Sequence, residues 1–394
     1  MNMKKYLLSF AVLMMGATLL TGCLNDDNDG PKKVDVLVSN GAYVLCTGNM
    51  SNAIDGSLTY YNYDGQAASQ KVFQAANGRS LGLTPNSAIM YGSKMYVVVT
   101  NENTIEVIDP KTQKSIRQIN TIEEIGDVEG VNPRCITAAD GILYISTYGA
   151  STMEYDANWN PTTSGNGYVA AIDTTTFTLR NVYTAGSYPE GLCVANNKIY
   201  VANSDYSAIT KASISVIDIT TGVDTPIKNE NIRNPQDIVA TSDGGMVYFL
   251  DFGEYDASWN QVNAGVYAYN GSSVVKIIPN ATMWYPIGQF IYTINAPYGA
   301  GAVSYQAYNI NYSSSLTLPI TGIDYPNAIG VDPVSGHVFI GSYNKNPDTG
   351  RADYSANGYV QEFTGEGSKV GSSFTCGVGP KAILFQTSVA SITY

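Results

Sequence analysis

The strongest constraint on the fold is a sequence repeat with a period of about 49 residues. Each unit begins at a proline and continues through an apolar strand, a turn and further short strands. Residues 85–119 contain one complete unit, with predicted strands at 87–91, 95–100, 104–109 and 115–119. The matching prolines are Pro85, Pro133, Pro189, Pro235, Pro286, Pro326 and Pro380. This period, with four short strands per unit, is typical of a propeller blade.

Seven anchors predict an all-β fold, a seven-bladed β-propeller with four-stranded antiparallel blades. The content of 30 Tyr and 38 Gly agrees with many short strands and tight turns. The last anchor begins only one strand, 380–385, whereas the first unit has no proline-led strand. We therefore expect the C-terminal strand to pair into the first blade and close the ring, which removes an open edge. Residues 34–38 are the alternative inner strand of that blade.

The N-terminal segment is predicted to be a targeting signal. Residues 1–22 contain two lysines, an apolar run and small residues, as a secretory signal peptide does. The ending Leu-Thr-Gly-Cys resembles a bacterial lipobox, which implies lipidation of Cys23; plain secretion is the alternative. Residues 23–33 form an acidic tether similar to the export signal of surface lipoproteins of Bacteroidetes, and 34–394 form one domain. The expected location is the outer membrane, lipid-anchored and facing outwards, with the periplasmic side as the alternative.

The charge and the rare residue types exclude several functions. A net charge of −12 disfavours nucleic acid, because phosphate binding needs clustered Lys and Arg. A single histidine, His337, sits in a predicted short turn, which disfavours catalytic triads and His-ligated metals. The five cysteines contain no C-x-x-C pair, so neither a zinc site nor an essential disulfide is expected. We expect no cofactor and no metal.

The candidate ligand-binding residues lie in loops that the repeat places on one face of the ring. Two long insertions contain near-copies, 154–160 and 254–260, of a Tyr-Asp-x-x-Trp motif, and a weaker copy occupies 353–357. Rigid aromatic side chains with polar tips suit binding. The candidates are Tyr155, Asp156, Trp159, Tyr255, Asp256, Trp259, Tyr206, Tyr298, Tyr343, Tyr354, Asn101 and Asn203. Alternatively, the motif only packs each loop against its own blade.

Carboxylate chemistry is the remaining enzymatic option. Acidic residues of the insertions could form an acid and base pair for a hydrolase or lyase. These residues are Glu154, Asp156, Glu254, Asp256 and Asp353. Because acidic loops are more often solvated, a non-enzymatic protein is favoured.

Several segments resemble the YncE-like propeller lipoproteins of Bacteroidetes surfaces. They are Tyr43–Asn49, Gly56–Tyr61, Asn77-Gly78, Leu81-Gly82, Lys94–Asn101, Ile105–Pro110, Asn132–Arg134 and Gly379-Pro380. One branch, the BtuG type, captures vitamin B12 for a TonB-dependent outer-membrane transporter. The resemblance therefore implies cobamide capture without a protein histidine on cobalt. Departures at Thr47 and in the long insertions leave a glycan-binding lipoprotein as the main alternative, followed by a hydrolase or lyase and an adhesive propeller.

Overall fold

The computed structural model describes residues 33–150, 154–155, 161–163, 165–204, 211–299 and 302–393. The described residues form six four-stranded sheets, one three-stranded sheet and two two-stranded hairpins, all antiparallel. The predicted all-β class is therefore confirmed. Within these ranges, neither short α-helix approaches the length or hydropathy of a membrane-spanning segment.

The sheets follow one another along the chain, apart from the first, which contains both ends. Its strands are β31 (Pro380–Thr393), β1 (Lys33–Cys46), β2 (Ser57–Asn62) and β3 (Ala67–Ser69). The second contains β4 (Pro85–Tyr91), β5 (Lys94–Val99), β6 (Thr104–Ile108) and β7 (Ser115–Asn120). The third contains β8 (Pro133–Ala139), β9 (Ile142–Thr147), β12 (Tyr168–Asp173) and β13 (Leu179–Thr184).

The remaining sheets repeat this order. The fourth contains β14 (Pro189–Ala195), β15 (Lys198–Asn203) and β16 (Ser213–Asp218). The fifth contains β17 (Pro235–Ala240), β18 (Val247–Asp251), β21 (Gly265–Tyr269) and β22 (Val274–Pro279). The sixth contains β23 (Met283–Ile287), β24 (Phe290–Asn295), β25 (Ser304–Asn309) and β26 (Ser314–Leu318). The seventh contains β27 (Tyr325–Val331), β28 (Val338–Tyr343), β29 (Tyr359–Phe363) and β30 (Lys369–Thr375).

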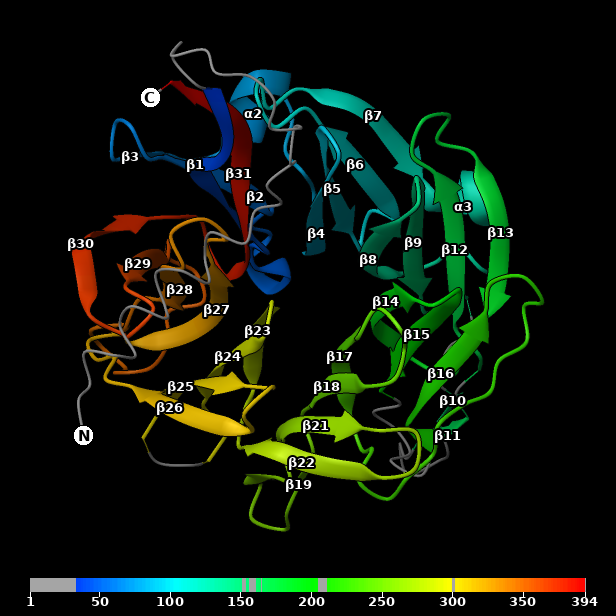
Figure 1. The fold of residues 1–394 in the computed structure, drawn as a ribbon. Coiled ribbons are helices and arrows are strands. Elements are labelled where there is room, and N and C mark those ends of the chain that lie inside the picture. The colour runs from blue at the N-terminus through cyan, green and yellow to red at the C-terminus, as the bar shows by residue number, and fades with distance from the viewer. Residues whose placement is uncertain are drawn as a thin grey trace, which may run out of the picture.

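Figure 1 shows the sheets side by side around a central opening. Apolar side chains pack between neighbouring sheets and form the core there. Tyr96 and Ile105 of the second sheet, for example, share one buried cluster with Leu143 and Ile145 of the third. Short helices, α2 (Val72–Asn77) and α3 (Thr121–Ile125), follow the outer strands of the first two sheets.

The fourth sheet departs from the predicted four strands. Beyond β16, the chain makes only isolated bridges, Ile214 with Ile227 and Ile217 with Asp224. The Asp224 carboxylate accepts hydrogen bonds from the Val216 amide at 2.8 Å and the Ser215 hydroxyl at 2.7 Å. The Asp224 side chain therefore accepts hydrogen bonds from β16 where a regular fourth strand would use its backbone.

The chain ends pair as predicted. Strand β31 pairs antiparallel with β1 and is the inner strand of the first sheet, so 380–385 takes this place. Residues 34–38 belong to β1, which is next to it. Strand β1 begins at Lys33, one residue before the predicted start of the domain at residue 34.

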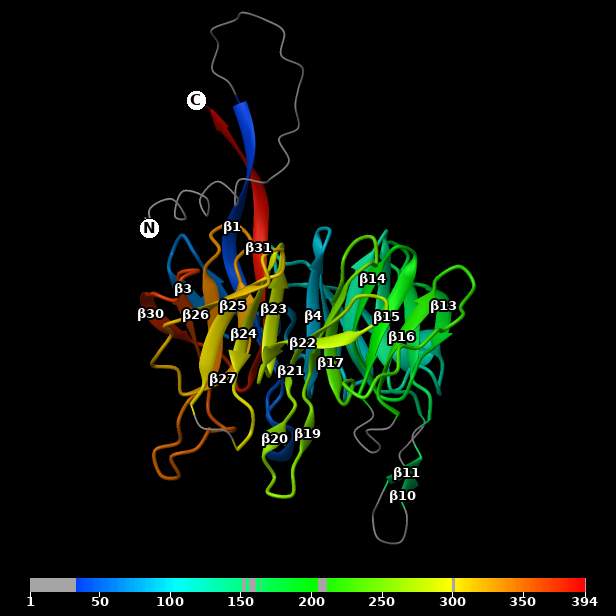
Figure 2. The ribbon, with the colours of Figure 1, turned by 60° about the horizontal axis from the view of Figure 1, so that its bottom comes forward.

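Beyond the ring, β1 and β31 continue as a two-stranded ribbon. Residues 33–39 pair there with residues 387–393. Figure 2 shows the ribbon rising from one face of the ring, while hairpins β10 (Glu154–Tyr155)–β11 (Pro161–Thr163) and β19 (Glu254–Tyr255)–β20 (Gln261–Val262) project from the other. We call these the ribbon face and the insertion face.

Six of the seven proline anchors occupy matching places. They lie at the first residue of an inner strand, or the second in β27, where a missing N–H costs least. Pro286 is the exception, because it pairs with Ile291 near the end of β23. The matching place in the sixth sheet is Thr282, whose amide donates to the Ile294 carbonyl at 2.9 Å. The assignment of Pro286 as an anchor is therefore wrong.

Candidate functional site

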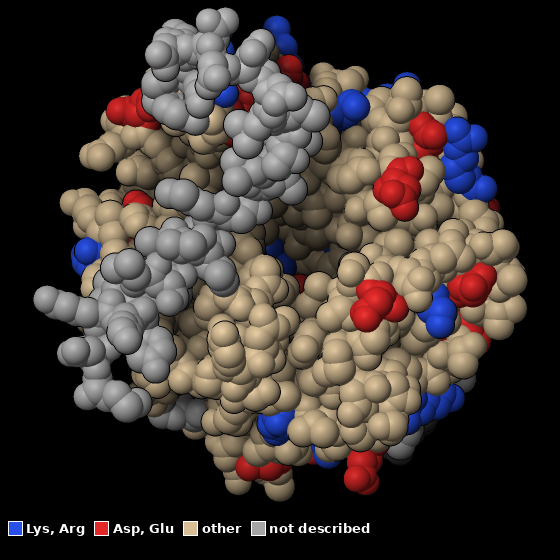
Figure 3. Space-filling model, in the orientation of Figure 1, with Lys and Arg blue, Asp and Glu red and all other residues tan. Residues whose placement is uncertain are grey.

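A cavity of about 1300 Å³ occupies the centre of the ring. Its wall contains residues from the inner strands of all seven sheets, together with loops of the insertion face. Figure 3, seen from the ribbon face, shows the hollow with basic atoms in its depth. A cavity this large exceeds the 300–1,000 Å³ common for small-molecule sites.

Polar side chains line the cavity where the inner strands begin. They immediately follow the confirmed anchors and are Asn86, Arg134, Glu190, Gln236, Asn327 and Lys381. Two of them bridge to the next sheet: the Asn86 amide donates to the Arg134 carbonyl at 3.0 Å, and the Asn327 amide to the Pro380 carbonyl at 2.8 Å. Six of the seven inner strands therefore each supply one member of a polar ring at their start.

Arg134 and Glu190 form a buried ion pair within this ring. The Arg134 Nη2 and Nε atoms lie 3.0 and 3.2 Å from the two Glu190 carboxylate oxygens. The Tyr148 hydroxyl donates to the same carboxylate, and the guanidinium lies over the Tyr148 ring, 4.8 Å from its centre. Burial alone would lower the pKa of Arg134, but Glu190 and Tyr148 together outweigh this effect and raise it.

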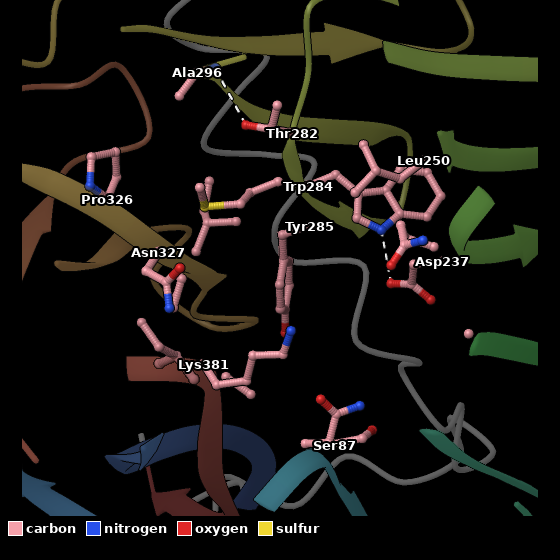
Figure 4. A pocket seen from close by; sticks show the side chains of 18 of the residues that line it. Ser87, Asp237, Leu250, Thr282, Trp284, Tyr285, Ala296, Pro326, Asn327 and Lys381 are labelled. Atoms are coloured by element: carbon pink, nitrogen blue, oxygen red, sulfur yellow. Dashed lines mark hydrogen bonds between the residues drawn. The ribbon is translucent and has the colours of Figure 1, made fainter. Parts of the chain in front are cut away.

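Asp237 is a second carboxyl group of the cavity wall. Its Oδ2 accepts a hydrogen bond from the Trp284 indole N–H at 2.8 Å (Figure 4), and its Oδ1 accepts one from the Ile238 amide at 2.9 Å. Burial raises the pKa of Asp237, against the opposing effect of Trp284. Gly191 on β14 makes room for this group, because a Cβ atom there would lie 2.3 Å from Asp237 Oδ1.

Four of the predicted tyrosines lie together around the insertion-face end of the cavity. Tyr255 and Tyr298 have ring centres 6.2 Å apart, and Tyr343 and Tyr354 are 4.9 Å apart with edge-to-face geometry. All four line the cavity. Tyr255, Tyr298 and Tyr354 are 54%, 66% and 58% exposed, so their rings are available for contact. We call these four residues the tyrosine rim.

Other predicted residues have different surroundings. Trp259 is 70% exposed beside Tyr255, so it does not pack against its own sheet as the alternative required. Asn101 is exposed outside the cavity lining, with its amide near the Met50 sulfur. Asn203 is buried, donates to Ser213 and Ser215, and lies outside the cavity lining. The predictions for Asp156, Trp159, Tyr206, Cys23 and the Tyr155 side chain lie outside the described residues.

The insertion carboxylates stabilise their own loops. Asp256 accepts hydrogen bonds from the Ser258 and Asn260 amides, and the Asn260 bond lowers its pKa. Asp353 accepts from Ser355 and Ala356 in the same way, and Glu254 pairs with Arg233 at 3.1 Å. Predicting these residues as an acid and base pair missed the carboxyls that the cavity contains, Glu190 and Asp237.

His337 lies in the turn before β28 and is paired with an acid. Its Nδ1 is 2.6 Å from a Glu362 oxygen, and this hydrogen bond raises the pKa of the imidazole. It is therefore not the freely solvated residue predicted from the sequence. Across the described ranges, no cluster of three or more His, Cys, Asp or Glu is arranged to hold a metal ion.

The sequence contained a signal for the residues that were missed. Arg134, Glu190 and Lys381 each follow an anchor proline directly, and a shared position in every repeat must face the same axis. Trp284 and Tyr285 were obscured because the repeat was aligned on Pro286.

The comparisons with solved structures bear on the fold alone. A protein from Bacteroides uniformis provisionally assigned as a 6-phosphogluconolactonase is 14% identical, with a TM-score of 0.57 over 89% of this chain and 100% of that one. A hypothetical selenium-binding protein from Sulfolobus tokodaii is 11% identical, with a TM-score of 0.55 over 92% and 93%. A Lactobacillus plantarum protein is 11% identical, with a TM-score of 0.52 over 88% and 99%. The described fold is thus β-propeller-like.

Sequence comparison assigns the family. No curated protein matches the sequence. One family profile matches residues 40–299, which contain the first five inner strands along the chain and the hairpin β19–β20. The chain therefore belongs to the family described as Domain of unknown function (DUF5074).

Proposed function

We propose that this protein is a seven-bladed, closed propeller that captures a large ligand at the tyrosine rim and central cavity. The observation that carries the proposal is the presence of two tyrosine pairs, Tyr255–Tyr298 and Tyr343–Tyr354, in the lining of a cavity of about 1300 Å³. Aromatic rings offer rigid contact area at low entropic cost. Buried polar groups below them would fix the orientation of the ligand.

The proposed ligand is a cobamide such as vitamin B12. A broad macrocycle with polar side arms suits a wide mouth with aromatic walls above polar groups. His337, the only histidine of the chain, lies outside the cavity lining, so cobalt would be bound without a protein imidazole. We further propose that Cys23 is lipidated, that the protein lies on the outer face of the outer membrane, and that it passes its ligand to a TonB-dependent transporter, as in the BtuG-type branch of the YncE-like proteins.

Calorimetry with cyanocobalamin tests the proposal. We expect binding to the wild type and at least tenfold weaker binding to the double variant Tyr255→Ala/Tyr298→Ala. Tyr312→Ala is the matched control, because Tyr312 is 78% exposed in the β25–β26 turn and does not line the cavity. No heat at micromolar protein, or equal loss in both variants, would exclude cobamide capture. Binding of an oligosaccharide instead would support the glycan alternative.

A hydrolase is the second candidate, favoured by two carboxyl groups in the cavity wall. Glu190 is held by Arg134, whereas burial raises the pKa of Asp237. Groups with such different environments can divide acid and base roles. The similar Bacteroides uniformis protein is provisionally assigned as a lactonase, a class that hydrolyses an ester bond. Asp237→Asn should abolish lactone hydrolysis if this candidate is correct, and hydrolysis retained in this variant would exclude it.

A further inference from the structure

Lys381 differs from three other members of the polar ring, which bond to the next sheet. Asn86 and Asn327 donate to backbone carbonyls of the next sheet, and Arg134 donates to Glu190 of the next sheet. Lys381 occupies the same place on β31. Among the described residues, however, it makes neither a hydrogen bond nor an ion pair through its ammonium group. Lys381 is exposed where it lines the cavity, so its ammonium group is accessible to a ligand there.

We infer that Lys381, with Tyr285 beside it, binds an anionic group of the ligand, a carboxylate or a phosphate. The inference rests on the proposed role of the cavity as the ligand site and adds the chemical class of one ligand group. Figure 4 shows the Lys381 side chain pointing into the cavity, toward Tyr285. An ammonium group offers three hydrogen-bond donors and no acceptor, so its complement is an acceptor, best an anion.

The carboxylates of the cavity wall leave this charge available. Glu190 is paired with Arg134 and accepts from Tyr148. Asp237 and Asp324 also line the cavity, but neither lies within 4.0 Å of the Lys381 ammonium group. Of the two cations in the cavity lining, Arg134 is therefore neutralised by direct contact and Lys381 is not.

Tyr285 supplies a second donor on the same side of the cavity. Burial, followed by the charge of Asp332, raises the pKa of Tyr285 to about 12, so its hydroxyl stays protonated at neutral pH. No hydrogen bond is made by this hydroxyl in the described part of the chain, although it lines the cavity. An ammonium and a phenol directed into one space can both donate to a single carboxylate or phosphate.

Trp284 provides a local reporter, because its indole is bound to Asp237 next to this space. Trp159 and Trp259 are the other two tryptophans of the chain, so Trp159→Phe/Trp259→Phe leaves Trp284 as the sole indole. We would titrate its fluorescence with glucuronate, glucose 6-phosphate and glucose at constant ionic strength. The two anionic sugars separate carboxylate from phosphate recognition, and glucose is the neutral control. We expect at least tenfold tighter binding of one or both anions than of glucose.

Three substitutions in this background assign the effect to Lys381. Lys381→Met should weaken anion binding about tenfold or more, and Lys381→Arg should retain most of it. Lys369→Met removes the same charge from the exposed start of outer strand β30 and should change nothing. Equal affinity for glucose and the anions, or equal loss in Lys381→Met and Lys369→Met, would overturn the inference.

The experiments distinguish failure of the proposed cobamide capture from failure of the proposed anion site at Lys381. Selective anion binding without cyanocobalamin binding would support the Lys381 site and reject the cobamide. Cyanocobalamin binding that Lys381→Met leaves unchanged, with no anion selectivity, would support the capture function and reject the anion site.

Discussion

At the residue scale, two ion pairs show how burial decides what a charge contributes. The Glu190 side chain is 4% exposed and the Arg134 side chain is 19% exposed. Each charge has lost most of its hydration, and the opposite charge of its partner compensates for that loss. Arg180 and Asp173 make an equally close pair at 2.8 Å, but Arg180 is 56% exposed. Water can replace either partner there.

Glu190→Gln should therefore destabilise the protein by about 3 kcal/mol, because it leaves the Arg134 guanidinium buried and without its counter-charge. Arg180→Ala should leave stability unchanged. Urea denaturation of the wild type and both variants measures the difference. Equal denaturation midpoints for the two variants would show that the Arg134–Glu190 pair contributes no more to stability than the exposed Arg180–Asp173 pair.

At the element scale, the closeness of neighbouring inner strands is set by small residues. Gly191 on β14 lies against Asp237 on β17, and its neighbour Glu190 completes the ion pair with β8. This one strand start therefore joins the third, fourth and fifth sheets. A larger residue at 191 must displace either the Asp237 carboxyl or the β17 backbone, because its Cβ would also lie 2.6 Å from the Asp237 Cα.

We expect Gly191→Ala to cost about 1–3 kcal/mol, as overpacking does elsewhere, and to disturb the Trp284–Asp237 hydrogen bond. Gly65→Ala is the control, because its Cβ would meet no atom closer than 4.0 Å. Thermal unfolding followed by indole fluorescence reports stability and the Trp284 environment together. A wild-type spectrum and melting temperature in Gly191→Ala would contradict this account of the strand contact.

The same scale explains what the sequence could and could not predict. Six of the seven inner strands could be located from the sequence, because proline has no N–H and is tolerated at the start of a strand. The sixth sheet uses Thr282 instead, and Pro286 then misaligned the repeat. Tyr255 and Tyr298 could be predicted because the repeat places their loops on one face, whereas the Arg134–Glu190 pair depends on which sheets are neighbours in space.

At the scale of the whole molecule, stability depends on β31, which comes last in the chain and lies innermost in the first sheet. Its first half buries Ile383 and Phe385, and Gln386 donates to the Pro110 carbonyl at 3.0 Å. Its second half belongs to the ribbon, where Val389 and Ile392 are 67% and 51% exposed. The first half of β31 therefore contributes to the core, whereas its second half is exposed to solvent.

Two truncations should separate these halves. Removal of residues 388–394 should leave the unfolding transition unchanged, because residues 388–393 add little to the core. Removal of residues 380–394 should abolish cooperative unfolding and cause aggregation, since it exposes the edge of β1 and the apolar surface beneath β31. Calorimetry and sedimentation velocity report these outcomes. Similar behaviour of the two truncated chains would mean that the seven sheets hold together without the joined ends.

The ribbon also determines which way the protein points. Because β1 begins at the far tip of the ribbon, the described part of the chain starts on the side opposite the tyrosine rim (Figure 2). Seven paired residues at about 3.3 Å each make a stalk on the order of 20 Å long. Under the proposed lipidation of Cys23, this stalk would separate the sheets from the membrane and turn the tyrosine rim away from it.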